Sequence, residues 1–148
     1  MTTVLAPVAG FVIGLAAVPD PVFSGGLVGP GTAVDPRRTA GEALAPLDGT
    51  VLKIHPHAYV IVGVDGRAVL VHLGIDTVRL RGEGFGVLVR EGQAVTAGRP
   101  VVVWDPVAVA GAGLSPVCPV VALEARPEAL RPLAAGPVLA GEELFRWD

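Results

Sequence analysis

The sequence has few of the residues that define several common classes of protein. Its 148 residues include one cysteine, one lysine and only 5% aromatic residues. The single cysteine, Cys118, excludes an internal disulfide framework and is typical of a reducing compartment, where we expect the thiol to be buried and inert. A net charge of −3 without any block of like charges argues against a nucleic-acid partner.

Long apolar runs are missing as well. The longest uncharged stretch, Pro106–Leu123, contains three prolines and cannot form one membrane-spanning helix. The N-terminal stretch Thr2–Val18 has no basic start and is broken by proline and glycine, so it makes a poor signal peptide. We therefore predict a cytoplasmic protein in which residues 1–148 form a single domain.

Glycine and proline are abundant, with 20 Gly and 14 Pro, and short apolar runs recur between turn signals. This pattern predicts an all-β sandwich or barrel. The runs are Val4–Leu5, Phe11–Val18, Val60–Val64, Ala68–Leu73, Val101–Trp104 and Val120–Leu123. We expect one or two short helices, because Asp105 and Pro106 can begin a helix over Val107–Ala112, and Pro127–Ala134 gives a weaker signal. The glycine-rich stretch Gly25–Gly41 is predicted to be a long ordered loop.

The strongest local signal is a hairpin that carries two histidines. Asp65 and Gly66 separate two apolar runs and favour a two-residue type I′ turn. In the register set by that turn, His57 and His72 lie diagonally opposite each other on the same face of the sheet, close enough to share one ligand. A three-residue loop would instead place them on opposite faces.

His72 has the surroundings of a nucleophile. A histidine on an apolar strand, taken alone, is most often an imidazole bonded to a backbone carbonyl. Here apolar neighbours surround it, Gly74 leaves the backbone uncovered beside it, and Asp76 adds a carboxylate. An imidazole with a near-neutral pKa in a partly dry site acts as a nucleophile in its free-base form, which suits phosphoryl transfer.

The segment around His72 resembles a known family. Gly66–Val78 matches, position for position, the phosphorylation-site motif of the glucose-type enzyme IIA domains of the bacterial phosphoenolpyruvate-dependent sugar phosphotransferase system. Other segments are similar to family segments in the family's order, and together they extend over nearly the whole chain. They include Ala45–Val51, His57–Tyr59, Gly82–Phe85 and Glu91–Val95.

The resemblance implies an antiparallel β-sandwich with a two-histidine site and no cofactor. The small carrier HPr would deliver a phosphoryl group to His72, and the group would pass to a cysteine on the enzyme IIB part of a sugar permease. His57 would stabilise the phosphoryl group without being phosphorylated. Family members also bind regulatory proteins according to their phosphorylation state, which is a further expectation for this chain.

Because donor and acceptor are both proteins, the resemblance places His72 in a docking patch with apolar content. Family position assigns to this patch Asp20, Val22, Phe23, Leu27, Val28, Leu70, Asp76 and Val78. Within the patch we expect Phe23 to be exposed, because it adjoins a flexible Ser-Gly-Gly run. Asp20 and Asp76 would meet basic residues of HPr.

Two other functions remain open at this point. His55 and His57, with His72 nearby, have the spacing of a zinc metallopeptidase site, and an incidental zinc ion at His57 and His72 is a further option. A biotinyl- or lipoyl-like module needs a lysine at a hairpin tip, whereas Lys53 is predicted to lie within a strand. The motif at His72 favours the phosphocarrier over both. The family has a threonine where this chain has His55, so the role of His55 is undetermined.

Overall fold

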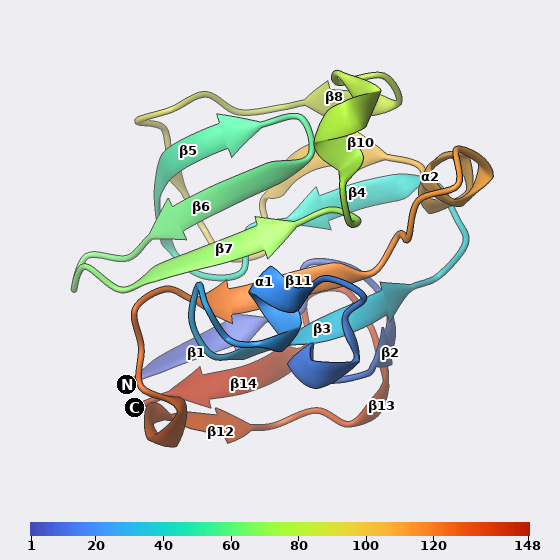
Figure 1. Cartoon of the computed structure of the whole chain (residues 1–148). Helices are drawn as coiled ribbons and strands as arrows, with labels where there is room; N and C mark the ends of the chain where they lie inside the picture. The colour runs from blue at the N-terminus through green and yellow to red at the C-terminus, as the bar shows by residue number, and fades with distance from the viewer.

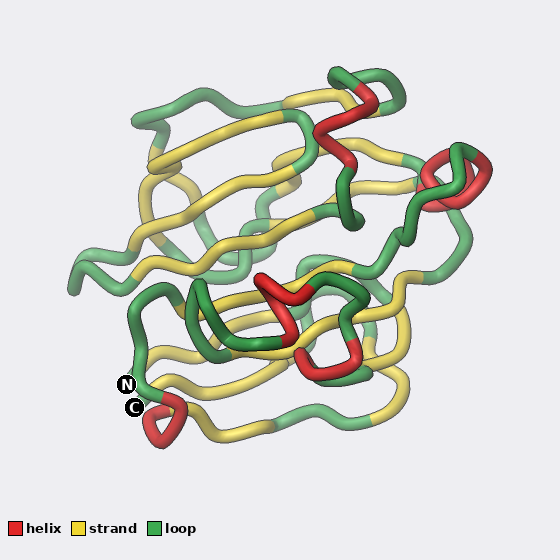
Figure 2. The backbone as a smooth tube through the Cα atoms, in the orientation of Figure 1, coloured by secondary structure: helices red, strands yellow, loops and turns green.

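Short antiparallel strands make up most of the chain in a computed structural model that describes all residues, 1–148 (Figures 1 and 2). The strands are β1 (Thr2–Leu5), β2 (Gly10–Val12), β3 (Gly31–Pro36), β4 (Gly41–Leu44), β5 (Gly49–His55), β6 (Ala58–Val62), β7 (Ala68–His72), β8 (Phe85–Val87), β9 (Ala94–Val95), β10 (Pro100–Trp104), β11 (Cys118–Ala122), β12 (Leu130–Pro132), β13 (Gly136–Val138) and β14 (Glu143–Trp147). The helices are α1 (Pro21–Ser24) and α2 (Pro106–Gly111), with 3-10 turns η1 (Leu15–Ala17), η2 (Thr77–Leu80) and η3 (Pro127–Ala129).

The strands form one large sheet and two small ones. The large sheet has eight strands in the order β13-β2-β3-β11-β7-β6-β5-β9, and the small sheets have the orders β1-β14-β12 and β4-β10-β8. A core of 26 buried residues, here called the inner core, joins the large sheet to both small sheets. The predicted all-β antiparallel sandwich is therefore confirmed.

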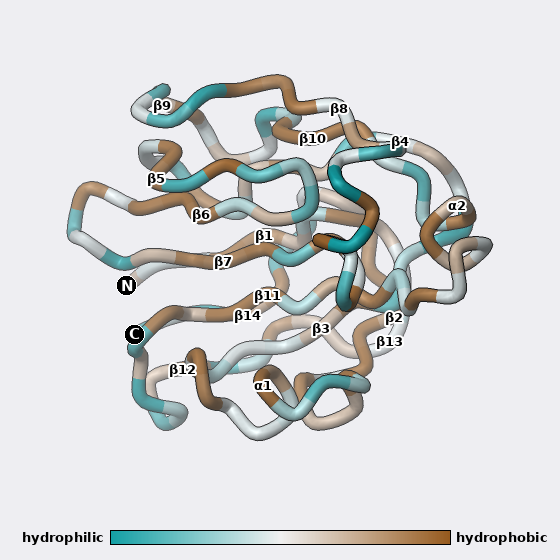
Figure 3. Tube along the Cα trace, turned by 45° about the horizontal axis from the view of Figure 1, so that its top comes forward, coloured by the Kyte–Doolittle hydropathy of each residue, from teal (hydrophilic) through white to brown (hydrophobic).

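The residues of strand β7 alternate between the two faces of the large sheet. Val69 and Val71 are fully buried in the inner core, whereas Leu70 and His72 are only partly buried and belong to the opposite face. This alternation follows from the two-residue period of a strand. Long stretches of β7 and β10 are apolar, whereas several of the connecting loops are polar (Figure 3).

The outer face of the large sheet carries a second, smaller cluster of buried side chains. This cluster, here called the outer cluster, consists of Val18, Phe23, Ala33, Ile75, Val117 and Val121. The segment that contains η1 and α1 covers strands β3 and β11 on this side (Figure 1). Strands β3 and β11 are therefore covered on both faces of the sheet.

The helix predictions have mixed outcomes. Helix α2 is confirmed, and the Asp105 carboxylate accepts a hydrogen bond of 2.9 Å from the Val107 backbone N–H, as expected of an N-cap. The predicted helix over Pro127–Ala134 is wrong beyond the η3 turn, because β12 pairs with β14. The predicted loop Gly25–Gly41 is also wrong in part, because β3 lies within it and pairs with β2 and β11.

The turn between β6 and β7 differs from the predicted type I′ turn. Ala58 pairs with His72 and Val62 pairs with Ala68, which leaves a longer connection than two residues. A type I′ turn needs positive φ at both central residues, but only Gly66, with φ of 85°, has it here. The predicted register is therefore wrong by one residue.

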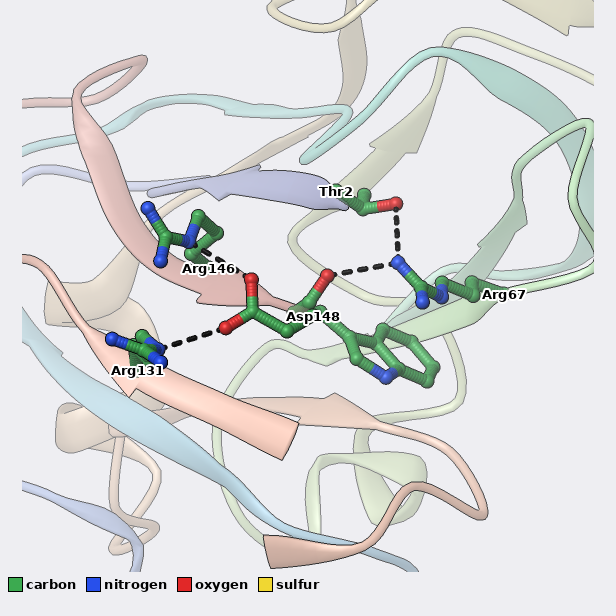
Figure 4. Close-up of polar contacts among 6 residues, drawn as sticks. Thr2, Arg67, Arg131, Arg146 and Asp148 are labelled. Carbon is green, nitrogen blue, oxygen red and sulfur yellow. Dashed lines mark hydrogen bonds and ion pairs between the residues drawn. The ribbon is translucent and has the colours of Figure 1, made fainter. Parts of the chain in front are cut away.

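A polar network fastens the start of β7 to both ends of the chain (Figure 4). The Arg67 guanidinium donates hydrogen bonds of 2.8 Å to the Trp147 carbonyl and 3.3 Å to the Thr2 hydroxyl, and it lies 5.4 Å from the centre of the Trp147 ring. Arg131 and Arg146 pair with the Asp148 carboxylate at 2.8 and 3.0 Å. The turn end of the β6–β7 hairpin and the paired strands β1 and β14 thus meet at one end of β7.

Candidate active site

Three histidines come together on the outer face of the large sheet. His55 ends β5 and pairs with Ala58 of β6, which in turn pairs with His72 at the end of β7. His57 lies between β5 and β6 in the turn that follows Pro56. Its ring centre is 5.2 Å from that of His72 in an edge-to-face arrangement with an interplanar angle of 72°.

His57 and His72 are therefore close, as predicted, but for a different reason. In the observed register, residues 57 and 72 would lie on opposite faces of the sheet if both belonged to strands. His57 belongs to a turn, where side chains do not alternate between the two faces, so it can lie on the same side as His72. Its backbone carbonyl accepts a hydrogen bond of 2.7 Å from the N–H of Leu73, which holds the turn against the end of β7.

The ring of His72 has a defined proton arrangement. Its Nδ1 lies 2.5 Å from the backbone oxygen of Gly74. A carbonyl oxygen only accepts hydrogen bonds, so Nδ1 carries the proton and donates it. In the neutral ring, Nε2 then keeps its lone pair, which makes Nε2 the nucleophilic atom.

The loop after β7 is shaped to present this carbonyl. Gly74 has φ of 82°, and a β-carbon placed there would lie 2.6 Å from the Thr77 side chain and 3.0 Å from the Ser115 carbonyl. The buried Thr77 hydroxyl donates a hydrogen bond of 2.8 Å to the Leu73 carbonyl, and Ile75 donates 2.8 Å to Ser115. These bonds fix the backbone on which the tautomer of His72 depends.

Burial lowers the pKa of His72 below its usual value of 6.5. The hydrogen bond to the Gly74 carbonyl and the carboxylates of Asp20 and Asp76 act in the opposite direction, but burial outweighs them. His72 is consequently neutral at pH 7, and its Nε2 keeps a free lone pair.

The pKa of His57 is lowered further, to about 4, first by burial and then by the neighbouring His72 and His55. His57 is therefore also neutral at pH 7. A neutral imidazole still has one N–H group, with which it can donate a hydrogen bond to a phosphoryl oxygen held by its neighbour. No group of three or more His, Cys, Asp or Glu side chains is arranged to hold a metal ion.

Phe23 is buried, and the prediction that it is exposed is wrong. The Asp20 carboxylate accepts a hydrogen bond of 2.9 Å from Val22 and caps α1. Phe23 belongs to the outer cluster, and its ring centre is 5.2 Å from that of His72. Its side chain removes water from one side of the imidazole and so contributes to the lowered pKa.

Other residues of the predicted docking patch are exposed. Leu27 and Val78 are 76% and 62% exposed, and Val22 is 43% exposed. The other members of the patch range from partly buried to exposed: Asp20, Val28, Leu70 and Asp76.

Gly74 and Thr77 belong to the site but were not among the predicted site residues. Both lie within the motif segment Gly66–Val78, so the signal was present. Gly74 contributes through its backbone conformation and its carbonyl, and Thr77 contributes through a hydrogen bond to the backbone. A pattern of side chains in the sequence does not indicate such contributions. Cys118 is buried as predicted, and burial raises the pKa of its thiol to about 12.

The fold and the site together define a class of protein, namely an antiparallel β-sandwich with a neutral nucleophilic histidine beside a second imidazole and exposed apolar side chains. Residues 2–127 match the family described as "phosphoenolpyruvate-dependent sugar phosphotransferase system, EIIA 1". The chain belongs to this family and is a glucose-type EIIA component of such a system.

Individual relatives agree with this assignment. A glucose-specific EIIA component of Bacillus cereus is 39% identical over 121 residues, which are 80% of this chain and 72% of the relative. A glucose-specific EIIBCA component of Corynebacterium glutamicum is 38% identical over 82% of this chain, but over only 18% of its own length. The structure of glucose permease IIA from Mycoplasma capricolum matches with a TM-score of 0.89 and 33% identity, over 97% of this chain and 93% of that one. None of the helices has the length and apolar character needed to cross a membrane.

Proposed function

We propose that the chain is a cytoplasmic phosphocarrier that accepts a phosphoryl group from phospho-HPr on Nε2 of His72 and passes it to a cysteine of an enzyme IIB domain. The whole chain, 1–148, acts as one EIIA domain. The observation that carries the proposal is the hydrogen bond from Nδ1 of His72 to the Gly74 carbonyl, which leaves Nε2 as the free nucleophile beside His57.

Each step exchanges one bond to phosphorus for another. The Nε2 lone pair of His72 attacks the phosphorus atom carried by HPr, and the donor's bond to phosphorus breaks with its electron pair returning to HPr. The IIB thiolate then attacks, and the bond between phosphorus and Nε2 breaks with its electrons returning to the imidazole. Such transfers depend mainly on alignment and on stabilisation of the phosphoryl oxygens.

His57 supplies that stabilisation in the proposed reaction. Its ring is adjacent to His72 and neutral, so it adds no positive charge that would hold the phosphoryl group too firmly for onward transfer. One N–H from His57 to a phosphoryl oxygen lowers the energy of the transition state more than that of the resting enzyme. His57 is therefore needed for transfer but not for covalent attachment.

The exposed apolar side chains support docking of both protein partners. Val22, Leu27 and Val78 are exposed, and Asp20 and Asp76 add negative charge near His72 that complements basic residues of HPr. The C. glutamicum relative carries this type of domain in one chain with IIB and IIC parts, which supports a IIB partner here. A permease of the glucose or N-acetylglucosamine type is the proposed destination.

Phosphorylation of His72 also gives the docking surface a second state. The phosphoryl group adds negative charge amid apolar side chains, and this changes which surfaces the patch accepts. We therefore include binding of regulatory proteins in the proposed function. Equal affinities of the phosphorylated form and of His72→Ala for each candidate partner would contradict this part.

The test is phosphoryl transfer in a reconstituted system of phosphoenolpyruvate, enzyme I, HPr and a IIB domain. His72→Gln should accept no phosphoryl group, whereas His57→Gln should become phosphorylated but pass the group to IIB slowly. Radiolabel on the protein at alkaline pH, lost in acid, measures the first step, and label on IIB measures the second. Phosphorylation of His72→Gln at the wild-type level would contradict the proposal. If His57→Gln accepted no phosphoryl group while His72→Gln did, His57 would be the acceptor and His72 the stabilising residue.

A further inference from the structure

His55 stands beside the two-histidine site and has no part in the proposed transfer. Its pairing with Ala58, and the pairing of Ala58 with His72, put these three residues in one row across β5, β6 and β7. Residues paired across antiparallel strands project from the same face of a sheet. His55 and His72 therefore flank Ala58 on the outer face, and Ala58 itself is buried.

The ring of His57 belongs to the same group of imidazoles. Its centre is 5.8 Å from that of His55, with the planes inclined by only 30°, and 5.2 Å from that of His72. His55 thus stacks on one side of the ring, while His72 meets it edge to face on another. Both contacts are within the range in which aromatic rings attract each other.

The orientation of His57 has no other evident support from side chains. Of the three histidines, only His72 makes a hydrogen bond through its ring within the chain. His57 lies in a turn, and its ring is not enclosed as that of a core residue is. A side chain that must direct one N–H at a phosphoryl oxygen loses rate if its ring samples several orientations.

We propose that His55 is a positioning residue that holds the ring of His57 against His72 by stacking. This inference rests on the proposed function for its effect on transfer, but the contact itself is a property of the chain. In this role His55 acts only through the ring of His57, so an aromatic ring without nitrogen can replace it.

The experiment compares His55→Ala with His55→Phe. His55→Ala removes the stacking surface and should slow transfer from phosphorylated protein to IIB about tenfold, which corresponds to about 1.4 kcal/mol, while phosphorylation by HPr changes little. His55→Phe keeps a stacking ring and should restore transfer to near the wild-type rate. Leu52→Ala, at a half-exposed position of the same strand, is the matched control and should leave both steps unchanged.

Nuclear magnetic resonance of the imidazole groups separates this inference from the proposed function. In His55→Ala, the His57 ring signals should broaden or shift toward averaged values, and in His55→Phe they should stay dispersed. Slow transfer in both variants would show that the nitrogens of His55 matter and would overturn the stacking role. Unchanged transfer and unchanged His57 signals in His55→Ala would overturn it as well. If the wild type accepted no phosphoryl group, the proposed function would fail, and the His57 signals would still decide whether His55 holds this ring.

Discussion

The two faces of β7 are built from the same strand but serve different purposes. Val69 and Val71 face the inner core, which holds the sheets together with closely packed aliphatic side chains. Leu70 and His72 face the outer side, where the outer cluster is small and the neighbouring apolar side chains are exposed. The inner face therefore contributes to stability alone, whereas the outer face contributes to stability and also sets the protonation and orientation of an imidazole. Substitutions on the two faces should separate these properties.

The largest loss of stability is expected on the inner face. Ile61 is fully buried in the inner core on β6, and Ile61→Ala should lower the free energy of unfolding by about 4 kcal/mol, because it leaves a cavity. Denaturant unfolding measures this loss. The folded fraction should accept phosphoryl groups at the wild-type rate, and a slower rate per folded molecule would show that the two faces are coupled.

Phe23→Ala tests the outer face. The loss of a buried ring should lower the free energy of unfolding by about 3 kcal/mol, the lower end of the range for buried phenylalanine. Water that reaches His72 should also raise its pKa toward 6.5, which a histidine titration followed by nuclear magnetic resonance detects. Phe11→Ala, at a position that is 54% exposed, is the control and should leave the pKa of His72 unchanged. An unchanged His72 pKa in Phe23→Ala would show that other residues keep it dry.

Gly74→Ala and Gly66→Ala form a matched pair, because both glycines have φ above 80°. At Gly66 a β-carbon meets nothing within 4 Å, so only the backbone conformation opposes alanine, at about 1 kcal/mol. At Gly74 the close contact with Thr77 adds to the cost of the backbone conformation. We therefore expect Gly74→Ala to lower the free energy of unfolding by about 2 kcal/mol. Nitrogen chemical shifts of His72 should show a mixture of tautomers only in Gly74→Ala. The same mixture of tautomers in Gly66→Ala would show that the Gly74 carbonyl does not determine the tautomer of His72.

The last prediction is a pH dependence of stability to which the histidines of the outer face contribute. The pKa of His57 is about 4 in the folded protein and 6.5 in the unfolded chain, so unfolding takes up a proton between these values. Stability should therefore fall as the pH decreases from 6.5 to 4, and the lowered pKa of His72 acts in the same direction. Unfolding curves across this range should be less pH-dependent for His57→Gln. An equal slope in both proteins would assign the dependence to other groups.

Local signals in the sequence predicted local structure well. Helix α2 follows from Asp105 and Pro106, and the family follows from the motif around His72. Both depend on residues that are neighbours in the chain. The all-β class followed similarly from short apolar runs between turns.

Features that depend on distant segments could not be predicted in this way. Strand β3 forms within a glycine-rich stretch because β2 and β11 offer partners on both sides. Phe23 is buried because α1 returns to the outer face of the sheet, although its neighbours in the sequence suggested exposure. The proximity of His57 and His72 was predicted from a wrong register, and it arises from the conformation of a turn that the alternation rule does not describe.

The network around Arg67 has a consequence for how such a domain can be joined to other proteins. Thr2 pairs with Trp147, so the two ends of the chain lie side by side, next to the start of β7 (Figure 1). His72 lies at the other end of that strand. A linker attached at either end would leave the sandwich on the side away from the nucleophile, and tethered domains would keep free access to it. Fusion in either order is thus compatible with an unchanged site, since chain ends that lie together at the surface tolerate insertion and permutation.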